Sequence, residues 1–437
     1  MAFSEWRKLP VSLSELCINT TLRCGQSFRW HNIAESEEWR CVLYGRLISL
    51  KQDSSCLFYR TYQSQSSALP TPPTSELPSR AQSDTEFHIK DDHTLRIIKH
   101  YLNLSSNLGD LYAQWSSDDP NFKKKAPQFT GIRILRQDPW EALVSFICSS
   151  NNNISRISQM VEKLCLHYGP LVGTIEGRAY HDFPTPEALA GKDVEGNLRT
   201  LGFGYRARYI YQTAVMVSQE REKGWLESLC NPESPAFGVE ARPGDGMKPE
   251  GRQGYRDAHE SLLELQGVGP KVSDCVCLMG LGWGESVPVD THVWQIAQRD
   301  YRFGKGSQKS LTKATYDAVA NHFRKLWGQE AGWAQSVLFT ANLRSFADRL
   351  AATKVEAVLK EDDSKIEIKT ETKTETKTEL TELILIAPEH DADVELEEPE
   401  SKPMIKNNEK KRKATTDGAM HVSQTTETRR TSKRLRR

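Results

Sequence analysis

The chain has 437 residues, 38% of them hydrophobic, and its basic and acidic side chains balance to a formal net charge of zero. The charge is unevenly placed, because residues 354–400 carry a net −10, residues 401–437 carry +9, and residues 1–353 carry +1. This length allows two or three domains, and the near-neutral first 353 residues exclude nucleic-acid binding through bulk positive charge. Any such binding there must come from a local patch.

The cysteines and the apolar runs indicate the cellular compartment. Nine cysteines, an odd number without the spacing of a disulfide framework, indicate a reducing environment. No apolar run approaches the length of a membrane span, and the first residues lack an apolar signal segment. We therefore expect a soluble intracellular protein without a membrane partner.

The first part of the chain is predicted to be a β domain over residues 1–135. Short β-rich runs alternate over residues 39–62, broken at Gly45 and at residues 53–55, which indicates an antiparallel meander. Residues 63–85 are rich in Ser, Pro and Gln and are predicted to be a disordered insertion. A helix is expected over residues 94–104, with Asp91 or Asp92 as its cap.

From residue 136 to 353 the pattern becomes helical. Asp138 and Pro139 predict the start of a helix that ends at Ser150, and three asparagines separate it from a helix beginning at Ile154. Further helices are expected over residues 205–219, 312–326 and 332–350, with a Pro/Gly-rich loop insertion at 231–254. Strands first and helices after predict an α+β fold, followed by a disordered charged tail at 354–437.

Residues 258–281 predict a helix-hairpin-helix motif. Gly267 and Gly269 form the turn, and Pro270 opens the second helix. Glycines allow a tight turn whose N–H groups can meet a DNA phosphate at a helix start. A purely structural turn fits the same residues equally well.

Lys271 and Asp290 are the candidate catalytic pair. Lys271 stands one residue into the second helix, where the positive helix end favours a neutral, nucleophilic amine. Asp290 follows a Gly/Pro-rich connection that can fold it back towards Lys271, and a carboxylate there would oppose positive charge developing on a sugar as its base departs. The alternative is a surface lysine and a helix N-cap aspartate.

The hairpin and the segment PVDTHVW resemble the core of the 8-oxoguanine DNA glycosylases, within the helix-hairpin-helix glycosylase superfamily. Four separated blocks strengthen the resemblance: GQSFRW at 25–30, FICSSNNNISRI at 146–157, LGFGYRARYI at 201–210 and GWAQSVLF at 332–339. The resemblance covers about residues 1–350. It implies a bifunctional enzyme that flips 8-oxoguanine paired with cytosine out of duplex DNA, attacks C1′ with Lys271 and nicks the strand by β-elimination.

The resemblance also implies roles for further residues. The base pocket would comprise Gly25, whose carbonyl accepts the N7–H that distinguishes 8-oxoguanine, together with Cys275, Met279, Gln335 and Phe339. The DNA contacts would be Asn151 in the gap left by the flipped base, Arg156 and Arg206 on the cytosine, Tyr205 as a wedge, His292 on a phosphate, and Gly267 and Gly269 in the hairpin. By spacing alone, Met279 and Phe339 are core residues. One departure concerns His292, because Asn342 stands where the family has an acid.

No cofactor is expected. The resemblance implies a structural cation held by backbone carbonyls around Leu263, Leu265 and Val268, which leave no sequence signature. An iron–sulfur cluster is excluded because no cysteine follows Cys277. Cys275 and Cys277 point to different faces of a helix and make a poor metal pair, so no metal ligand is assigned.

Two rival functions and the location stay open at this point. A monofunctional glycosylase for alkylated bases would keep Asp290 but lack Lys271, and a non-catalytic DNA-binding module would need neither Asp290 nor the GQSFRW block. The partner expected is duplex DNA containing oxidised guanine, bound by a monomer. The basic runs at 410–413 and 433–437 favour nuclear import or a nucleic-acid-binding arm, or neither, and a mitochondrial form is left open.

Overall fold

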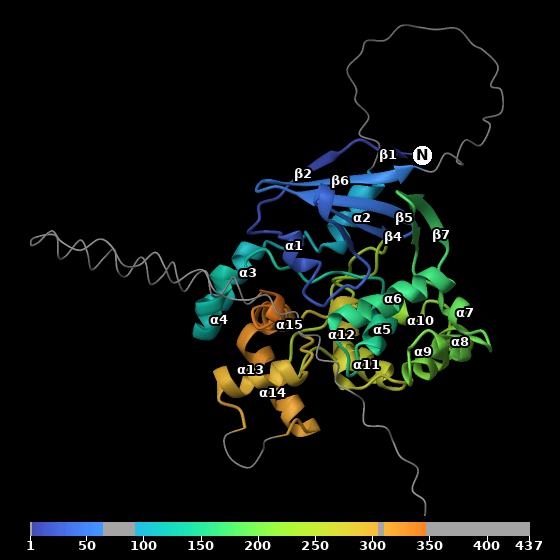
Figure 1. Ribbon diagram of the computed structural model, residues 1–437. Coiled ribbons are helices and arrows are strands. Elements are labelled where there is room, and N and C mark those ends of the chain that lie inside the picture. The colour runs from blue at the N-terminus through green and yellow to red at the C-terminus, as the bar shows by residue number, and fades with distance from the viewer. Residues whose placement is uncertain (1, 64–91, 305–309, 347–437) are drawn as a thin grey trace, which may run out of the picture. The chain divides into compact units, whose positions relative to one another are not determined.

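The computed structural model describes residues 2–63, 92–304 and 310–346 (Figure 1). All of them belong to one compact unit. The predicted tail at 354–437 lies outside the described residues, as does the predicted insertion from residue 64 onwards. No helix in the described ranges is both long and apolar enough to cross a membrane.

An antiparallel sheet forms the N-terminal part. Its strands are β1 (Ala2–Phe3), β2 (Arg7–Pro10), β3 (His31–Ile33), β4 (Glu38–Leu43), β5 (Arg46–Gln52) and β6 (Cys56–Gln63). The order is β1-β6-β5-β4-β3, with β2 also paired to β6. The predicted meander is confirmed as β4, β5 and β6, with Trp39 opposite Leu50 and Leu50 opposite Tyr59.

One face of this sheet is apolar and covers a core of its own. Because side chains alternate across a strand, Trp39, Cys41, Ile48 and Leu50 point to the same side. They pack with α1 (Ile18–Thr21) and α2 (His93–Tyr101). The expected helix after the insertion is confirmed as α2, and Asp92 is its cap, with the carboxylate accepting a hydrogen bond from the Leu95 N–H at 3.1 Å.

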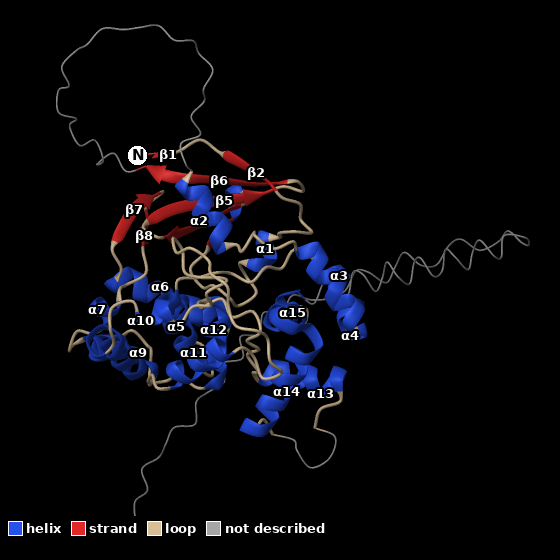
Figure 2. Ribbon diagram, turned by 180° about the vertical axis from the view of Figure 1, so that it is seen from behind, coloured by secondary structure: helices blue, strands red, loops and turns tan. Residues whose placement is uncertain are grey.

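The rest of the unit is mainly helical, and its core is continuous from α3 to α15. The helices are α3 (Leu108–Asp118), α4 (Pro120–Lys125), α5 (Pro139–Cys148), α6 (Ile154–Tyr168), α7 (Pro186–Leu189), α8 (Val194–Thr200), α9 (Arg206–Val215), α10 (Trp225–Ser228), α11 (Gln253–Leu263), α12 (Pro270–Met279), α13 (Thr291–Tyr301), α14 (Lys313–Trp327) and α15 (Ala331–Thr340). Figure 2 shows the strands together on one side of this unit and the helices α5 to α15 on the other. The predicted α+β fold is confirmed.

The loop between α5 and α6 is built as its sequence predicts. Asp138 caps α5 by accepting a hydrogen bond from the Glu141 N–H at 2.9 Å. Asn153 caps α6 by accepting one from the Arg156 N–H at 2.8 Å. Asn151 lies between these helices with a φ of 47°, a left-handed conformation that Asn tolerates better than most residues.

Three features differ from expectation. A hairpin of β7 (Leu171–Ile175) and β8 (Arg178–His181) follows α6 and lies beside the main sheet (Figure 2). The loop insertion ends at residue 252 because α11 already begins at Gln253, where Gly254 lets the helix approach the Trp283 ring more closely than a Cβ would permit. Helix α15 ends at Thr340, ten residues early, because the chain tightens there into 3-10 turns.

Candidate active site

The turn between α11 and α12 has two glycines that serve different purposes. Gly267 has a φ of +77°, and a Cβ on it would lie 2.6 Å from the Cβ of Tyr209 in α9, so both backbone and packing require glycine. Gly269 has a φ of −103° and a Cβ there would meet nothing within 4 Å. The protein itself therefore does not demand glycine at 269, whereas a closely approaching DNA backbone would.

Lys271 is half-buried and is held from the side of α5. Its Nζ lies 3.3 Å from the Ser149 Oγ, just beyond the end of α5. It also lies 5.3 Å from the centre of the Phe146 ring. The amine is thus positioned by contacts that sequence analysis missed, although both residues stand in the FICSSNNNISRI block.

Asp290 is a helix N-cap, as the alternative interpretation expected, and it also faces the site. Its Oδ1 accepts hydrogen bonds from the N–H groups of His292 and Val293, both at 2.9 Å, at the start of α13. Its Oδ2 lies 3.7 Å from the Nδ1 of His292. These two hydrogen bonds hold the carboxylate through Oδ1, and Oδ2 takes part in neither of them.

One cavity of about 50 Å³ joins Lys271 and Asp290. It is also lined by all five residues expected in the base pocket, which are Gly25, Cys275, Met279, Gln335 and Phe339. Lining residues that were not predicted are Cys24, Gln26, Phe146, Pro288, Val293, Ser336 and Thr340. Five segments far apart in the sequence therefore meet at this cavity.

Cys275 is part of the cavity wall, and its pKa is affected by both catalytic candidates. Burial raises the pKa of the Cys275 thiol to about 11, with Lys271 working to lower it and Asp290 to raise it. This thiol is therefore neutral at physiological pH and sits near both catalytic candidates.

Gly25 has a φ of +85°, and a Cβ there would lie 3.1 Å from the Cδ1 of Ile154. The Ile154 side chain at the start of α6 therefore packs closely against Gly25.

The predicted DNA contacts gather around the loop at 149–153. Tyr205 is 48% exposed, and its hydroxyl donates to the Ser150 carbonyl at 3.0 Å. Arg206 is buried, and its guanidinium donates to the carbonyls of Ser150 and Asn151. In this structure Arg206 therefore supports the loop that presents Asn151, instead of standing free to meet a cytosine.

The remaining two predicted contacts, Arg156 and His292, are at the surface. Arg156 is exposed in the first turn of α6, and His292 is 59% exposed with its ring edge-on to Phe339 at 6.0 Å. The amide of Asn342 is hydrogen-bonded to the Leu338 carbonyl and to the Arg299 guanidinium. Asn342, where the resemblance implies an acid, therefore engages Arg299.

The described residues contain neither a cluster of metal ligands nor a disulfide. Over the ranges that the structure describes, no group of three or more His, Cys, Asp or Glu side chains could hold a metal ion. All nine cysteines are free thiols. The cavity lining itself offers the Lys271 amine, the Asp290 carboxylate and the thiols of Cys24 and Cys275.

The fold and this site define a helix-hairpin-helix DNA repair protein. Residues 144–328 match the HhH-GPD superfamily of base excision DNA repair proteins, and residues 8–143 match the 8-oxoguanine DNA glycosylase N-terminal domain. The solved structure of MBOgg1 in complex with a low-affinity DNA ligand is similar to this chain, with a TM-score of 0.58 and 26% identity over 78% of this chain and 97% of that one.

Curated relatives narrow the class. The N-glycosylase/DNA lyase of Saccharomyces cerevisiae is 37% identical over 363 residues, which are 78% of this chain and 86% of the yeast protein. The N-glycosylase/DNA lyase OGG1 of Arabidopsis thaliana is 33% identical over 346 residues, 78% of this chain and 80% of the plant protein. The chain belongs to the N-glycosylase/DNA lyase family.

Proposed function

We propose that this chain is a bifunctional DNA glycosylase that excises 8-oxoguanine paired with cytosine from duplex DNA and then nicks the abasic strand. The observation that carries the proposal is that Lys271 and Asp290 share one cavity with the five residues expected to hold the base. The match to the 8-oxoguanine glycosylase N-terminal domain and the two curated relatives support the same substrate and the same two reactions.

The chemistry begins with the amine. The Lys271 Nζ attacks C1′, the bond from C1′ to the base breaks, and the base leaves with the bonding electrons. The Asp290 carboxylate opposes the positive charge on the sugar as this bond breaks. The adduct loses a proton from its nitrogen and the C1′–O4′ bond breaks, which gives a Schiff base. Loss of a C2′ proton then expels the 3′ phosphate, which leaves with the electrons of the C3′–O bond.

Recognition of the lesion precedes this step. Gly25 offers a carbonyl to the N7–H of the oxidised base, where ordinary guanine presents an acceptor and would lose a hydrogen bond, at a cost of about 1–3 kcal/mol. Phe339, which is half-buried in the cavity wall, offers an aromatic face to the base. Arg156 reads the cytosine, and Arg206 joins it once its guanidinium leaves the carbonyls of Ser150 and Asn151. Asn151 fills the gap, and Tyr205 wedges the bent step.

The test uses duplexes with one 8-oxoguanine opposite each of the four bases. We expect strand cleavage greatest opposite cytosine and a covalent adduct trapped by borohydride, with the adduct absent in Lys271→Gln. Base release without a nick or adduct would favour a monofunctional glycosylase. Binding with neither reaction would favour a non-catalytic module. Equal trapping by Lys271→Gln would refute the role of this lysine.

We also propose that backbone carbonyls of the hairpin bind a structural cation. The carbonyls of Leu263, Leu265 and Val268 lie around the turn whose backbone is fixed by the packing of Gly267 on Tyr209. We expect DNA to bind more tightly in K⁺ than in tetramethylammonium at equal ionic strength. Equal affinities in the two salts would argue against the cation.

The cellular location is proposed from the sequence. The basic runs at 410–413 and 433–437 support import into the nucleus, although both lie outside the described residues. Replacing the Lys and Arg residues of both runs with Ala should move a fluorescent fusion of the full chain out of the nucleus. An unchanged distribution would contradict the proposal, and a mitochondrial signal in the unaltered fusion would reveal a second location.

A further inference from the structure

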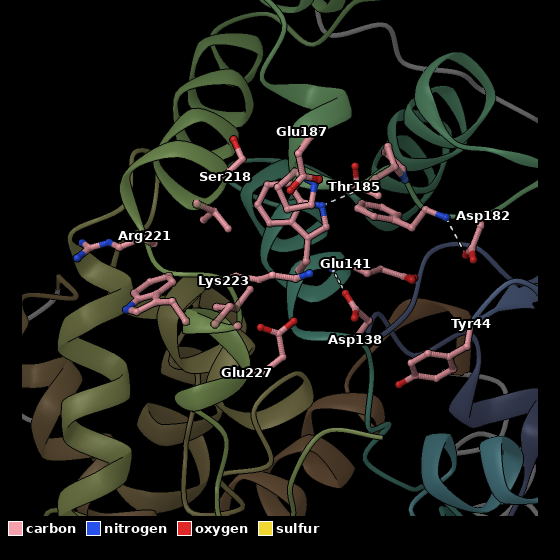
Figure 3. A pocket seen from close by; sticks show the side chains of 18 of the residues that line it. Tyr44, Asp138, Glu141, Asp182, Thr185, Glu187, Ser218, Arg221, Lys223 and Glu227 are labelled. Atoms are coloured by element: carbon pink, nitrogen blue, oxygen red, sulfur yellow. Dashed lines mark hydrogen bonds between the residues drawn. The ribbon is translucent and has the colours of Figure 1, made fainter. Parts of the chain in front are cut away.

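A second cavity, larger than the first, opens at the other end of α5 (Figure 3). It encloses about 570 Å³ and shares no lining residue with the active-site cavity. Its walls come from the end of β4, the first turn of α5, residues 182–187 and residues 217–227. Cavities of this size commonly hold small-molecule ligands.

Acidic groups dominate the lining of this second cavity. Six carboxylates face three basic groups, namely Asp138, Glu141, Asp182, Glu187, Glu222 and Glu227 against Arg29, Arg221 and Lys223. Arg29 is already committed to Glu141 through two hydrogen bonds of 2.9 and 2.8 Å. Arg221 pairs with Glu264, which lies outside the lining. The cavity therefore keeps an excess of negative charge.

Asp138 and Glu227 are the centre of this excess. Neither forms an ion pair with a basic group among the residues that the structure describes, and Figure 3 shows both carboxyl groups directed into the cavity. Burial raises the pKa of the Asp138 carboxyl, and the negative charge of Glu227 raises it further. Glu227 is exposed and Asp138 is partly buried, with Arg29 near enough to act on the Asp138 charge. A cation placed between the two carboxylates would offset the negative charge of both and part of the cost of burying Asp138.

Aromatic side chains form other parts of the wall. Trp140, Phe183 and Trp225 line the cavity. The protein's own cations already lie over two of these rings, with the Arg221 guanidinium 4.9 Å from the centre of Trp225 and that of Arg29 5.7 Å from Phe183. Aromatic faces attract cations and also pack against methylene groups.

We propose that this cavity binds a linear aliphatic polyamine. The carboxylates stand on separate elements, α5, α7 and α10, so ammonium groups spaced along one flexible chain can each meet one of them. The methylene groups between them would lie against the aromatic walls. A single divalent metal fits less well, because the described carboxylates form no group of three that could hold one.

The test is calorimetric titration of the full chain with spermidine at fixed ionic strength. We expect a saturable site that is weakened at least tenfold in Asp138→Asn/Glu227→Gln. Asn preserves the capping acceptor at the start of α5, so the fold should persist, which a melting curve checks. Asp110→Asn/Asp118→Asn removes two exposed carboxylates from α3 and should leave the site unchanged, as a control for diffuse charge.

A second variant keeps the test decisive if the first one does not fold. Lys223→Ala removes a positive charge from the lining without touching a carboxylate, and we expect spermidine to bind it more tightly. The proposal is overturned if spermidine binds Asp138→Asn/Glu227→Gln as tightly as wild type, or if the α3 control loses as much. It is also overturned if Lys223→Ala leaves the affinity unchanged, or if Mg²⁺ at equal charge displaces spermidine equally well.

Discussion

The Nζ of Lys271 and the Oγ of Ser149 lie 3.3 Å apart, which joins the start of α12 to the end of α5. The Ser149 hydroxyl donates to the Phe146 carbonyl at 2.7 Å, so its oxygen accepts from the amine. Asn151 follows two residues later. The segment just after α5 therefore contacts the proposed nucleophile, Lys271, and leads directly to Asn151, which is proposed to fill the gap in the duplex.

Removing this contact should slow the chemistry without weakening DNA binding. In Ser149→Ala the amine loses an orienting hydrogen bond worth about 1 kcal/mol, which corresponds to roughly a fivefold slower reaction. Single-turnover base excision measures the rate, and a DNA-binding titration measures the affinity. Ser150→Ala is the matched control, because Ser150 contributes its carbonyl and not its hydroxyl to the contacts of Tyr205 and Arg206. Equal slowing in the two variants would contradict the role of Ser149.

Asp290 combines two duties that substitutions can separate. Asn at 290 retains an oxygen for the N–H groups of His292 and Val293 but carries no charge. We expect Asp290→Asn to melt like wild type while base excision slows by about 10²–10³-fold, the scale of one lost electrostatic stabiliser. Asp290→Ala should be equally slow and also less stable by about 1 kcal/mol. An active Asp290→Asn variant would remove the carboxylate from the mechanism.

The two hairpin glycines should respond differently to alanine. Gly267→Ala places a Cβ in a left-handed backbone and against Tyr209, so the free energy of unfolding should fall by about 1–3 kcal/mol. Gly269→Ala meets open space and should not change the melting temperature. It should instead weaken DNA binding, because the added methyl group occupies the side that a phosphate would approach. Unchanged affinity in Gly269→Ala would leave this glycine without an explanation.

Much of the fold could be predicted because its signals are local. The caps at Asp138 and Asn153 each bond a residue three positions away, and the alternation in β4 to β6 is visible in sequence. The β7–β8 hairpin could not be predicted in this way. Its residues Val172, Ile175 and Tyr180 are fixed by packing against Val42 and Leu47 of the main sheet, which is a tertiary contact.

The site residues also differ in whether the local sequence could predict them. Lys271 and Asp290 stand out by their chemistry, whereas Met279 and Phe339 could be assigned only through the family resemblance. An apolar residue on a helix has the same spacing whether it faces a core or a cavity. The contact between Lys271 and Ser149 spans 122 positions, so no local pattern predicts it.

Acid should weaken one ion-pair cluster in a defined pH range. Asp300 accepts hydrogen bonds from Arg299 and from Lys125, the latter at 2.6 Å. Burial acts to raise the pKa of the Asp300 carboxyl, but these partners outweigh it and hold the pKa at about 2, below the ordinary value of 3.8. A carboxyl whose pKa is lower in the folded state stabilises the fold above its unfolded pKa. That contribution is lost as pH falls from about 4 to 2.

Asp300→Asn tests this linkage. The variant should be less stable than wild type at pH 7 by on the order of 1–2 kcal/mol, and the difference should shrink as pH falls towards 2. Urea unfolding at pH 7, 4 and 2.5 measures it. Lys125→Met removes one partner from the same carboxylate and should also destabilise the protein at pH 7, by less because Arg299 remains. A constant difference between wild type and Asp300→Asn across these pH values would show that the ion pairs are not its cause.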